Sequence, residues 1–193
     1  MINSIIFDWG GVLAPSDNKI GVIRLKKNFE FDEKVFFKYY DNHEDDYCNT
    51  NNYTEFLNDV SKKFNIPVNS IIKAFNADPP DEVFSIAKKL SNNYKTYILS
   101  NQIKFRTDYI KKTFDLNFFN NTFFSNEMGV KKPSNKIYTI LLNEINQKPE
   151  HCLFIDDSPI NIEAAKKLGF NVILFKSIEQ LKKELTSFSI QIK

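Results

Sequence analysis

Apolar residues form five short runs along the chain, and charged or turn-forming residues bound each run. Short runs of this kind, rich in β-branched and aromatic side chains, are typical of buried strands. We therefore predict strands at residues 4–8, 96–100, 122–125, 152–156 and 171–175.

Segments with helical periodicity lie between the later runs. Ser134 is suited to cap a helix, Pro159 is suited to begin one, and Gly169 is suited to follow its end. We predict helices at residues 103–114, 134–145, 159–168 and 178–185. Strands that alternate with helices indicate parallel β-α-β units. The predicted fold class is therefore α/β, with a doubly wound parallel sheet.

The first two predicted strands are separated by residues 9–95, far more than one crossover helix needs. This interval contains four amphipathic patterns, at residues 20–29, 34–40, 54–64 and 68–75. We predict a small α-helical cap at residues 15–79, inserted into an α/β core made of residues 1–14 and 80–193. The return to the core would follow the turn-forming sequence at residues 78–81, and the acidic run at residues 41–46 is predicted to be a solvated loop.

The composition excludes several classes of protein. Hydrophobic residues make up 42% and charged residues 26%, which is ordinary for a globular protein. A net charge of +2, spread along the chain, argues against a nucleic-acid partner. Two cysteines are too few for a disulfide framework or a zinc site. We find no membrane-length apolar run and no signal-peptide pattern, so we expect a cytoplasmic protein.

Asp8 ends the first predicted strand, and a glycine pair follows at residues 10–11. A buried carboxylate is unfavourable unless a metal, a cation or hydrogen bonds compensate its charge. Ser100 and Asp156 also end predicted strands, and Asp157 comes next. Because ligands bind at the carboxyl ends of the strands in a doubly wound sheet, we expect these side chains to converge at one edge, under the cap.

These residue types suit phosphoryl transfer. A carboxylate such as Asp8 can attack phosphorus and form an aspartyl-phosphate. Mg²⁺ prefers oxygen ligands, which Asp8, Asp157 and a backbone carbonyl near Gly10 could supply. Lys132 could neutralise phosphate, and the Ser100 hydroxyl could donate a hydrogen bond to it.

Four segments in this order resemble the haloacid dehalogenase (HAD) superfamily. They are FDWGGVL at residues 7–13, LSN at residues 99–101, KKP at residues 131–133 and DDS at residues 156–158. Within the superfamily, the chain is similar to small sugar-phosphate phosphatases of the α-D-glucose-1-phosphate phosphatase type and to the N-terminal phosphatase domains of epoxide hydrolases.

The resemblance implies a Mg²⁺-dependent phosphatase that acts on a small phosphorylated metabolite, such as a sugar phosphate. It implies that Asp8 is the nucleophile, that the Gly10 carbonyl and Asp157 help Asp8 to bind the metal, and that the backbone at Gly10 lies close to the phosphate.

The resemblance also assigns roles to the later segments. Ser100 and the amide of Asn101 would bind phosphate, and Lys132 would stabilise both phosphate and Asp8. Asp156 would support the metal site from behind. Asn161 could be a further hydrogen-bonding partner of the site or only a helix cap.

One position departs from the pattern of most phosphatases in the superfamily. They carry a second aspartate, a general acid and base, where this chain has Gly10, as the glucose-1-phosphate type also does. Such catalysis contributes about 10²- to 10⁴-fold, so we expect slow turnover or an easy leaving group. His43 is either a surface residue or a substitute proton donor. Trp9 could shape the pocket or pack beneath the sheet.

Two other functions are compatible with these motifs. A 2-haloacid dehalogenase would share the fold and also lack the second aspartate, but it would use no metal, and the adjacent Asp156 and Asp157 would then repel each other uncompensated. A catalytically impaired binding or regulatory protein would keep the pocket without turnover. The missing acid argues against a phosphomutase.

Overall fold

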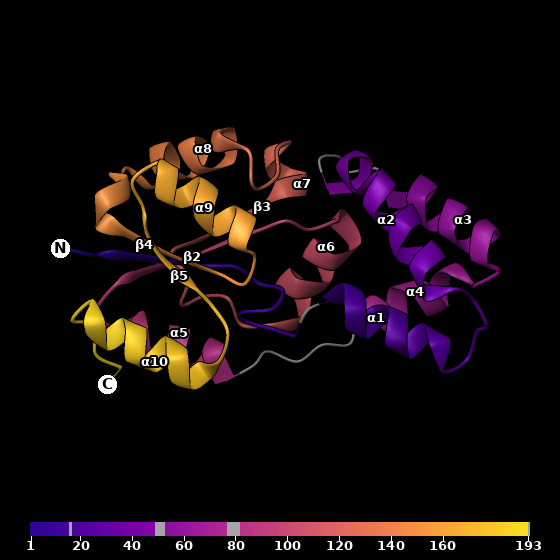
Figure 1. Cartoon of the computed structure of the whole chain (residues 1–193), viewed down its shortest axis with the longest axis horizontal. Coiled ribbons are helices and arrows are strands. Elements are labelled where there is room, and N and C mark those ends of the chain that lie inside the picture. Colours follow the sequence, from indigo (N-terminus) through magenta and orange to yellow (C-terminus); the bar gives the residue numbers. More distant parts are fainter. Residues whose placement is uncertain (16, 49–52, 77–81, 193) are drawn as a thin grey trace.

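The computed structural model describes residues 1–15, 17–48, 53–76 and 82–192 (Figure 1). Within these residues, five parallel strands form one sheet with the order β3-β2-β1-β4-β5. The strands are β1 (Ser4–Phe7), β2 (Lys95–Ser100), β3 (Asn121–Phe124), β4 (Cys152–Asp156) and β5 (Asn171–Leu174). All five predicted strands are confirmed, with boundaries that differ by no more than one residue.

Helices cover both faces of the sheet. Alternate residues of β1 point to opposite faces, so Ile5 and Phe7 pack with α5, α6 and α10, whereas Ile6 packs with α8 and α9. The helices of this part of the chain are α5 (Glu82–Leu90), α6 (Lys104–Thr113), α7 (Ser125–Met128), α8 (Asn135–Ile145), α9 (Pro159–Lys167) and α10 (Ile178–Ser187). The predicted doubly wound α/β fold is confirmed.

The sequence analysis missed α5. Its buried residues are Val83, Ile86, Ala87 and Leu90, which have the spacing of one helical face. The signal was therefore present in the sequence, in a short segment beside the turn-forming residues 78–81.

Four helices, which we call the helical cap, lie beyond the carboxyl ends of the strands (Figure 1). They are α1 (Asp17–Lys26), α2 (Glu33–Cys48), α3 (Tyr53–Phe64) and α4 (Val68–Phe75). Their apolar residues form a separate cluster that also takes in Ile103 and Phe105, at the start of α6. The exact division into a core and a cap stays a prediction, and the predicted turn at residues 78–81 lies outside the described residues.

The prediction of a solvated loop at residues 41–46 is wrong, because this run belongs to α2. No glycine or proline interrupts the chain between Glu33 and Cys48, so nothing in the sequence breaks the helix there. Among the described residues, no helix has both the length and the apolar character needed to cross a membrane.

Candidate active site

Asp8 lies at the carboxyl edge of the central strand, immediately after β1. It is 8% exposed, and its backbone N–H donates to the Ile155 carbonyl of β4 over 2.9 Å. Its Oδ1 accepts a hydrogen bond of 2.7 Å from the Trp9 N–H. The chain then turns at Gly11, whose φ of +80° favours glycine and where any Cβ would collide with the Asp157 carboxylate. Gly11 thus lets the loop after β1 approach Asp157, which follows β4.

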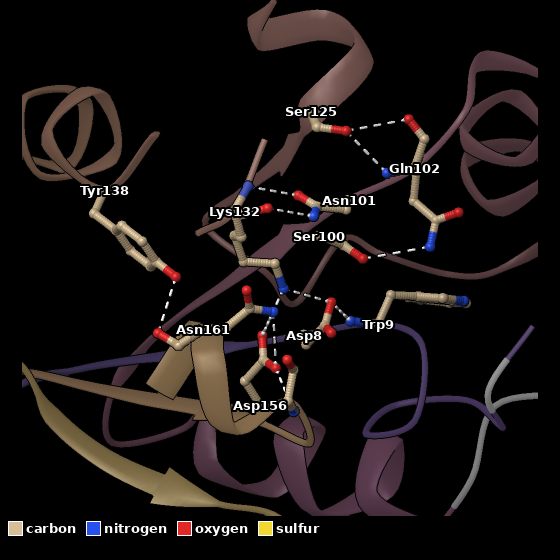
Figure 2. A network of polar contacts seen from close by, with 11 residues as sticks. Asp8, Trp9, Ser100, Asn101, Gln102, Ser125, Lys132, Tyr138, Asp156 and Asn161 are labelled. Atoms are coloured by element: carbon tan, nitrogen blue, oxygen red, sulfur yellow. Dashed lines mark hydrogen bonds and ion pairs between the residues drawn. The ribbon is translucent and has the colours of Figure 1, made fainter. Parts of the chain in front are cut away.

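Lys132 joins two carboxylates at this edge (Figure 2). Its Nζ lies 3.0 Å from Asp8 Oδ1 and 2.6 Å from Asp156 Oδ2, and the residue is 2% exposed. The Asn101 side chain holds the backbone of Lys132: Oδ1 accepts from the Lys132 N–H at 2.8 Å, and Nδ2 donates to the Lys132 carbonyl at 2.9 Å. Asn101 therefore positions the lysine, a role that the sequence analysis did not anticipate.

Asp156 is fully buried, and hydrogen bonds occupy both of its carboxylate oxygens. Oδ1 accepts from the Ser158 N–H at 2.8 Å, and the Asn161 carboxamide donates to Oδ1 and Oδ2 at 3.1 Å each. The buried Tyr138 hydroxyl donates to the Asn161 carbonyl at 3.0 Å. Asn161 thus contacts the site through its side chain, and Asp156 serves as an anchor for Lys132.

A group of carboxylates here is suited to a divalent cation. Asp8, Asp156 and Asp157 offer ligand oxygens that all lie within 4.8 Å of one another, and Asp157 is exposed. An all-oxygen donor set is what Mg²⁺ prefers. The ammonium of Lys132 contacts Asp8 and Asp156. A further positive charge bound among the three carboxylates would reduce their mutual repulsion, so a metal ion fits the electrostatics as well as the donor atoms.

The ionisation of the site follows from burial and from these charges. The pKa of Asp8 is raised to about 7: burial is the main cause, Asp156 adds to the rise, and Lys132 and a hydrogen bond with Ser100 oppose it. Burial lowers the pKa of Lys132, but Asp8 and Asp156 more than offset this, so the pKa lies above its usual value and the lysine is charged. A bound cation would favour the ionised Asp8 that a nucleophile requires.

Two residues that the sequence analysis missed extend the network from Ser100. The Gln102 carboxamide donates to Ser100 Oγ at 3.3 Å, and Ser125 Oγ accepts from the Gln102 N–H at 3.0 Å. Gln102 directly follows the LSN segment, which was the available signal. Ser125 had none, because only the pairing of β2 with β3 brings it here.

The two alternatives for Trp9 are now distinguished. Its ring is 1% exposed and packs against Phe84 and Phe114, with ring centroids 6.0 Å and 5.3 Å apart. The ring thus takes the second alternative and packs in the core, and it is the backbone N–H of Trp9 that donates to Asp8. His43 lies in α2, with Nδ1 2.7 Å from the Tyr39 carbonyl oxygen.

The family is shown by comparison with known sequences. The family described as haloacid dehalogenase-like hydrolase matches residues 2–169. The chain therefore belongs to the haloacid dehalogenase-like hydrolases. Among curated proteins, flavin mononucleotide hydrolase 1 of Arabidopsis thaliana is 31% identical over 71 residues, which are 37% of this chain and 29% of that protein. The chain thus matches less than a third of this relative.

Solved structures share the fold over nearly the whole chain. The HAD family enzyme BT-2542 of Bacteroides thetaiotaomicron, in its magnesium complex, is 25% identical with a TM-score of 0.79, over 95% of this chain and 98% of that one. The L-2-haloacid dehalogenase of Xanthobacter autotrophicus is 17% identical with a TM-score of 0.68, over 99% of this chain and 85% of that one. The fold is therefore shared both with an enzyme solved with magnesium and with a haloacid dehalogenase, and the reaction must be argued from the site.

Proposed function

We propose that this hydrolase is a Mg²⁺-dependent phosphatase of a small phosphorylated metabolite, with a sugar phosphate as the first candidate substrate. The observation that carries the proposal is the group of Asp8, Asp156 and Asp157, with the Lys132 ammonium against the first two. A structural relative, BT-2542, has been solved with magnesium and inorganic phosphate, which supports the same ligands here.

In the first step, a carboxylate oxygen of Asp8 attacks phosphorus while the bond from phosphorus to the ester oxygen breaks. The products are an aspartyl-phosphate and an alkoxide, which takes a proton from water. Lys132, the Ser100 hydroxyl and the Asn101 N–H would hold the phosphate oxygens. Bound Mg²⁺, held by Asp8, Asp157 and the Gly10 carbonyl, would neutralise negative charge on the phosphate.

In the second step, water attacks phosphorus and the bond to Asp8 breaks. This releases inorganic phosphate and a proton and restores the Asp8 carboxylate. Throughout both steps, Asp156 and Asn161 keep Lys132 in place. Because Gly10 offers no side chain to move protons, we expect esters with good leaving groups to be cleaved fastest.

The test is phosphate release from a panel of sugar phosphates and a nitrophenyl phosphate ester, with Mg²⁺ and with a chelator. Asp8→Asn should reduce metal-dependent release by about a thousandfold or more, because the nucleophile is lost. Asp115→Asn is the matched control, because this aspartate is exposed on the surface, and it should leave release unchanged.

Three outcomes would contradict the proposal. Release that Asp8→Asn does not affect would exclude the aspartyl-phosphate. Metal-independent chloride release from 2-chloropropionate would identify a dehalogenase. A folded protein that binds Mg²⁺ but releases nothing from any ester would be a binding or regulatory protein.

A further inference from the structure

Gln102 is a buried residue that directly follows the segment at residues 99–101, and it has no role in the mechanism above. Gln102 is 6% exposed, and its Nε2 lies 3.3 Å from Ser100 Oγ (Figure 2). Ser100 is itself 1% exposed and hydrogen bonds with Asp8. Asp8, Ser100 and Gln102 therefore form a chain of side chains that leads from the nucleophile into the protein interior.

The position of Gln102 is fixed independently of its side chain. The Ser125 hydroxyl accepts from the Gln102 N–H at 3.0 Å and donates to the Gln102 carbonyl at 3.3 Å. Ser125 is fully buried and stands at the first position of α7, directly after β3. One hydroxyl thus fixes both backbone groups of Gln102. The side-chain carboxamide then lies within hydrogen-bond distance of Ser100.

The direction of the hydrogen bond from Gln102 determines where the Ser100 proton points. A carboxamide nitrogen can only donate, so Ser100 Oγ must accept from it. The single hydroxyl proton of Ser100 is then directed to another acceptor, which is Asp8 in this structure. If Gln102 presented an acceptor instead, the Ser100 proton would turn toward it and away from the site.

We propose that Gln102 is a positioning residue that orients the Ser100 hydroxyl as a donor toward Asp8 and toward the phosphate bound there. This inference rests on the proposed phosphatase function. If Gln102 acts on the site through Ser100, its effect on catalysis should be larger when the Ser100 hydroxyl is present. A residue that merely filled buried space would have an effect independent of Ser100.

The test is a double-mutant cycle in the full-length protein with two readouts. One is kcat and KM for the best ester, and the other is the affinity for inorganic phosphate in the presence of Mg²⁺, measured by calorimetry. Gln102→Met keeps the length of the side chain but removes the donor. It should lower kcat/KM and phosphate affinity by about five- to tenfold, as expected for one neutral hydrogen bond.

Two further variants define the cycle. Gln102→Leu also removes the donor and should lower both readouts by about as much as Gln102→Met, because neither side chain can donate to Ser100. In a Ser100→Ala background, Gln102→Met should change either readout by less than about twofold, because the group through which it acts is gone.

Thr107→Val is the control for loss of a buried hydrogen bond nearby. The Thr107 hydroxyl is fully buried and donates to Asn126 Oδ1 at 2.7 Å. This variant should lower stability but leave kcat/KM unchanged and show no coupling to Ser100→Ala.

Equal effects of Gln102→Met with and without the Ser100 hydroxyl would overturn the inference while leaving the phosphatase intact. Wild-type activity in both Gln102→Met and Gln102→Leu would overturn it too. If the unaltered protein neither releases nor binds phosphate, the proposed function fails and the inference fails with it.

Discussion

The carboxyl edge of the sheet and the helical cap are held together by different interactions. At the sheet edge, directional hydrogen bonds and ion pairs join buried polar groups, as Lys132 and Asn161 do around Asp156. In the cap, the contacts at the centre are aromatic: Phe36 lies 5.3 Å from Phe31 and 4.9 Å from Phe64 between ring centroids.

We expect this difference in interactions to match a difference in role between the two regions. Hydrogen bonds fix atoms to within tenths of an ångström, which phosphoryl transfer needs. Apolar packing has little directional preference and tolerates changes of shape and sequence. We expect the sheet edge to determine the reaction and the helical cap to determine which substrate reaches it.

Among the substitutions that test this comparison, removing the cation at the sheet edge should have the largest combined effect on activity and stability. Lys132→Met leaves the buried Asp8 and Asp156 without their shared partner. We expect phosphate release to fall by about a hundredfold or more, and the free energy of unfolding in urea to fall by about 3–5 kcal/mol.

A second substitution sharpens this prediction. Adding Asp8→Asn to Lys132→Met should restore part of the stability but none of the activity, because it removes one buried charge. Lys136→Met, at an exposed position of α8, is the control and should change neither quantity. A Lys132→Met protein with full stability would show that the ion pairs contribute nothing to folding.

The stability of the helical cap should depend on its apolar packing. Phe36 is 2% exposed, and Phe36→Ala should lower the free energy of unfolding by about 3–5 kcal/mol. The Mg²⁺ affinity of the folded protein should change by less than about twofold, because the two regions share few partners. Val35→Ala, next to it and exposed, is the control. A parallel loss of Mg²⁺ affinity would mean that the cap and the site are one cooperative unit.

We expect Asp157 to contribute to Mg²⁺ binding and the adjacent Asp156 to contribute to stability. Asp157 is exposed, so Asp157→Asn should leave stability unchanged while weakening Mg²⁺ binding by at least about tenfold in calorimetry. Asp156 is fully buried, so Asp156→Asn should lower stability, because Lys132 loses a partner. The reverse pattern would assign the metal to Asp156.

The smallest effect concerns Trp9. Because the ring packs among Phe84 and Phe114, Trp9→Phe should lower the free energy of unfolding by about 1–2 kcal/mol and leave KM unchanged. Urea unfolding and steady-state kinetics together check this. A several-fold rise in KM without loss of stability would show that the Trp9 ring contacts the substrate.

The strands and the site residues at their ends could be predicted because both follow local rules. Buried parallel strands are continuous apolar runs. Asp8 follows β1, and Ser100 and Asp156 end β2 and β4, so a polar residue marks the carboxyl end of these three strands. Once the alternation of strands and helices indicated a parallel sheet, the carboxyl ends had to meet at one edge.

The wrong prediction at residues 41–46, the open alternatives for Trp9 and the missed residues Gln102 and Ser125 concern features that local patterns do not determine. All six residues at positions 41–46 are polar, and both loops and solvent-exposed helices have such a composition. The Trp9 side chain stands beyond the end of β1, where strand alternation no longer indicates its direction. The bonds between Ser125 and Gln102 join residues 23 positions apart, so only the folded sheet reveals them.

The central claim is that Asp8 becomes covalently phosphorylated during turnover. The direct measurement is mass spectrometry of the protein after acid quenching of a rapid mix with Mg²⁺ and the best ester. The account predicts one added phosphoryl group on the peptide that contains Asp8, absent from Asp8→Asn and from samples with chelator. Turnover without any phosphorylated peptide, or with the phosphoryl group on another residue, would contradict it.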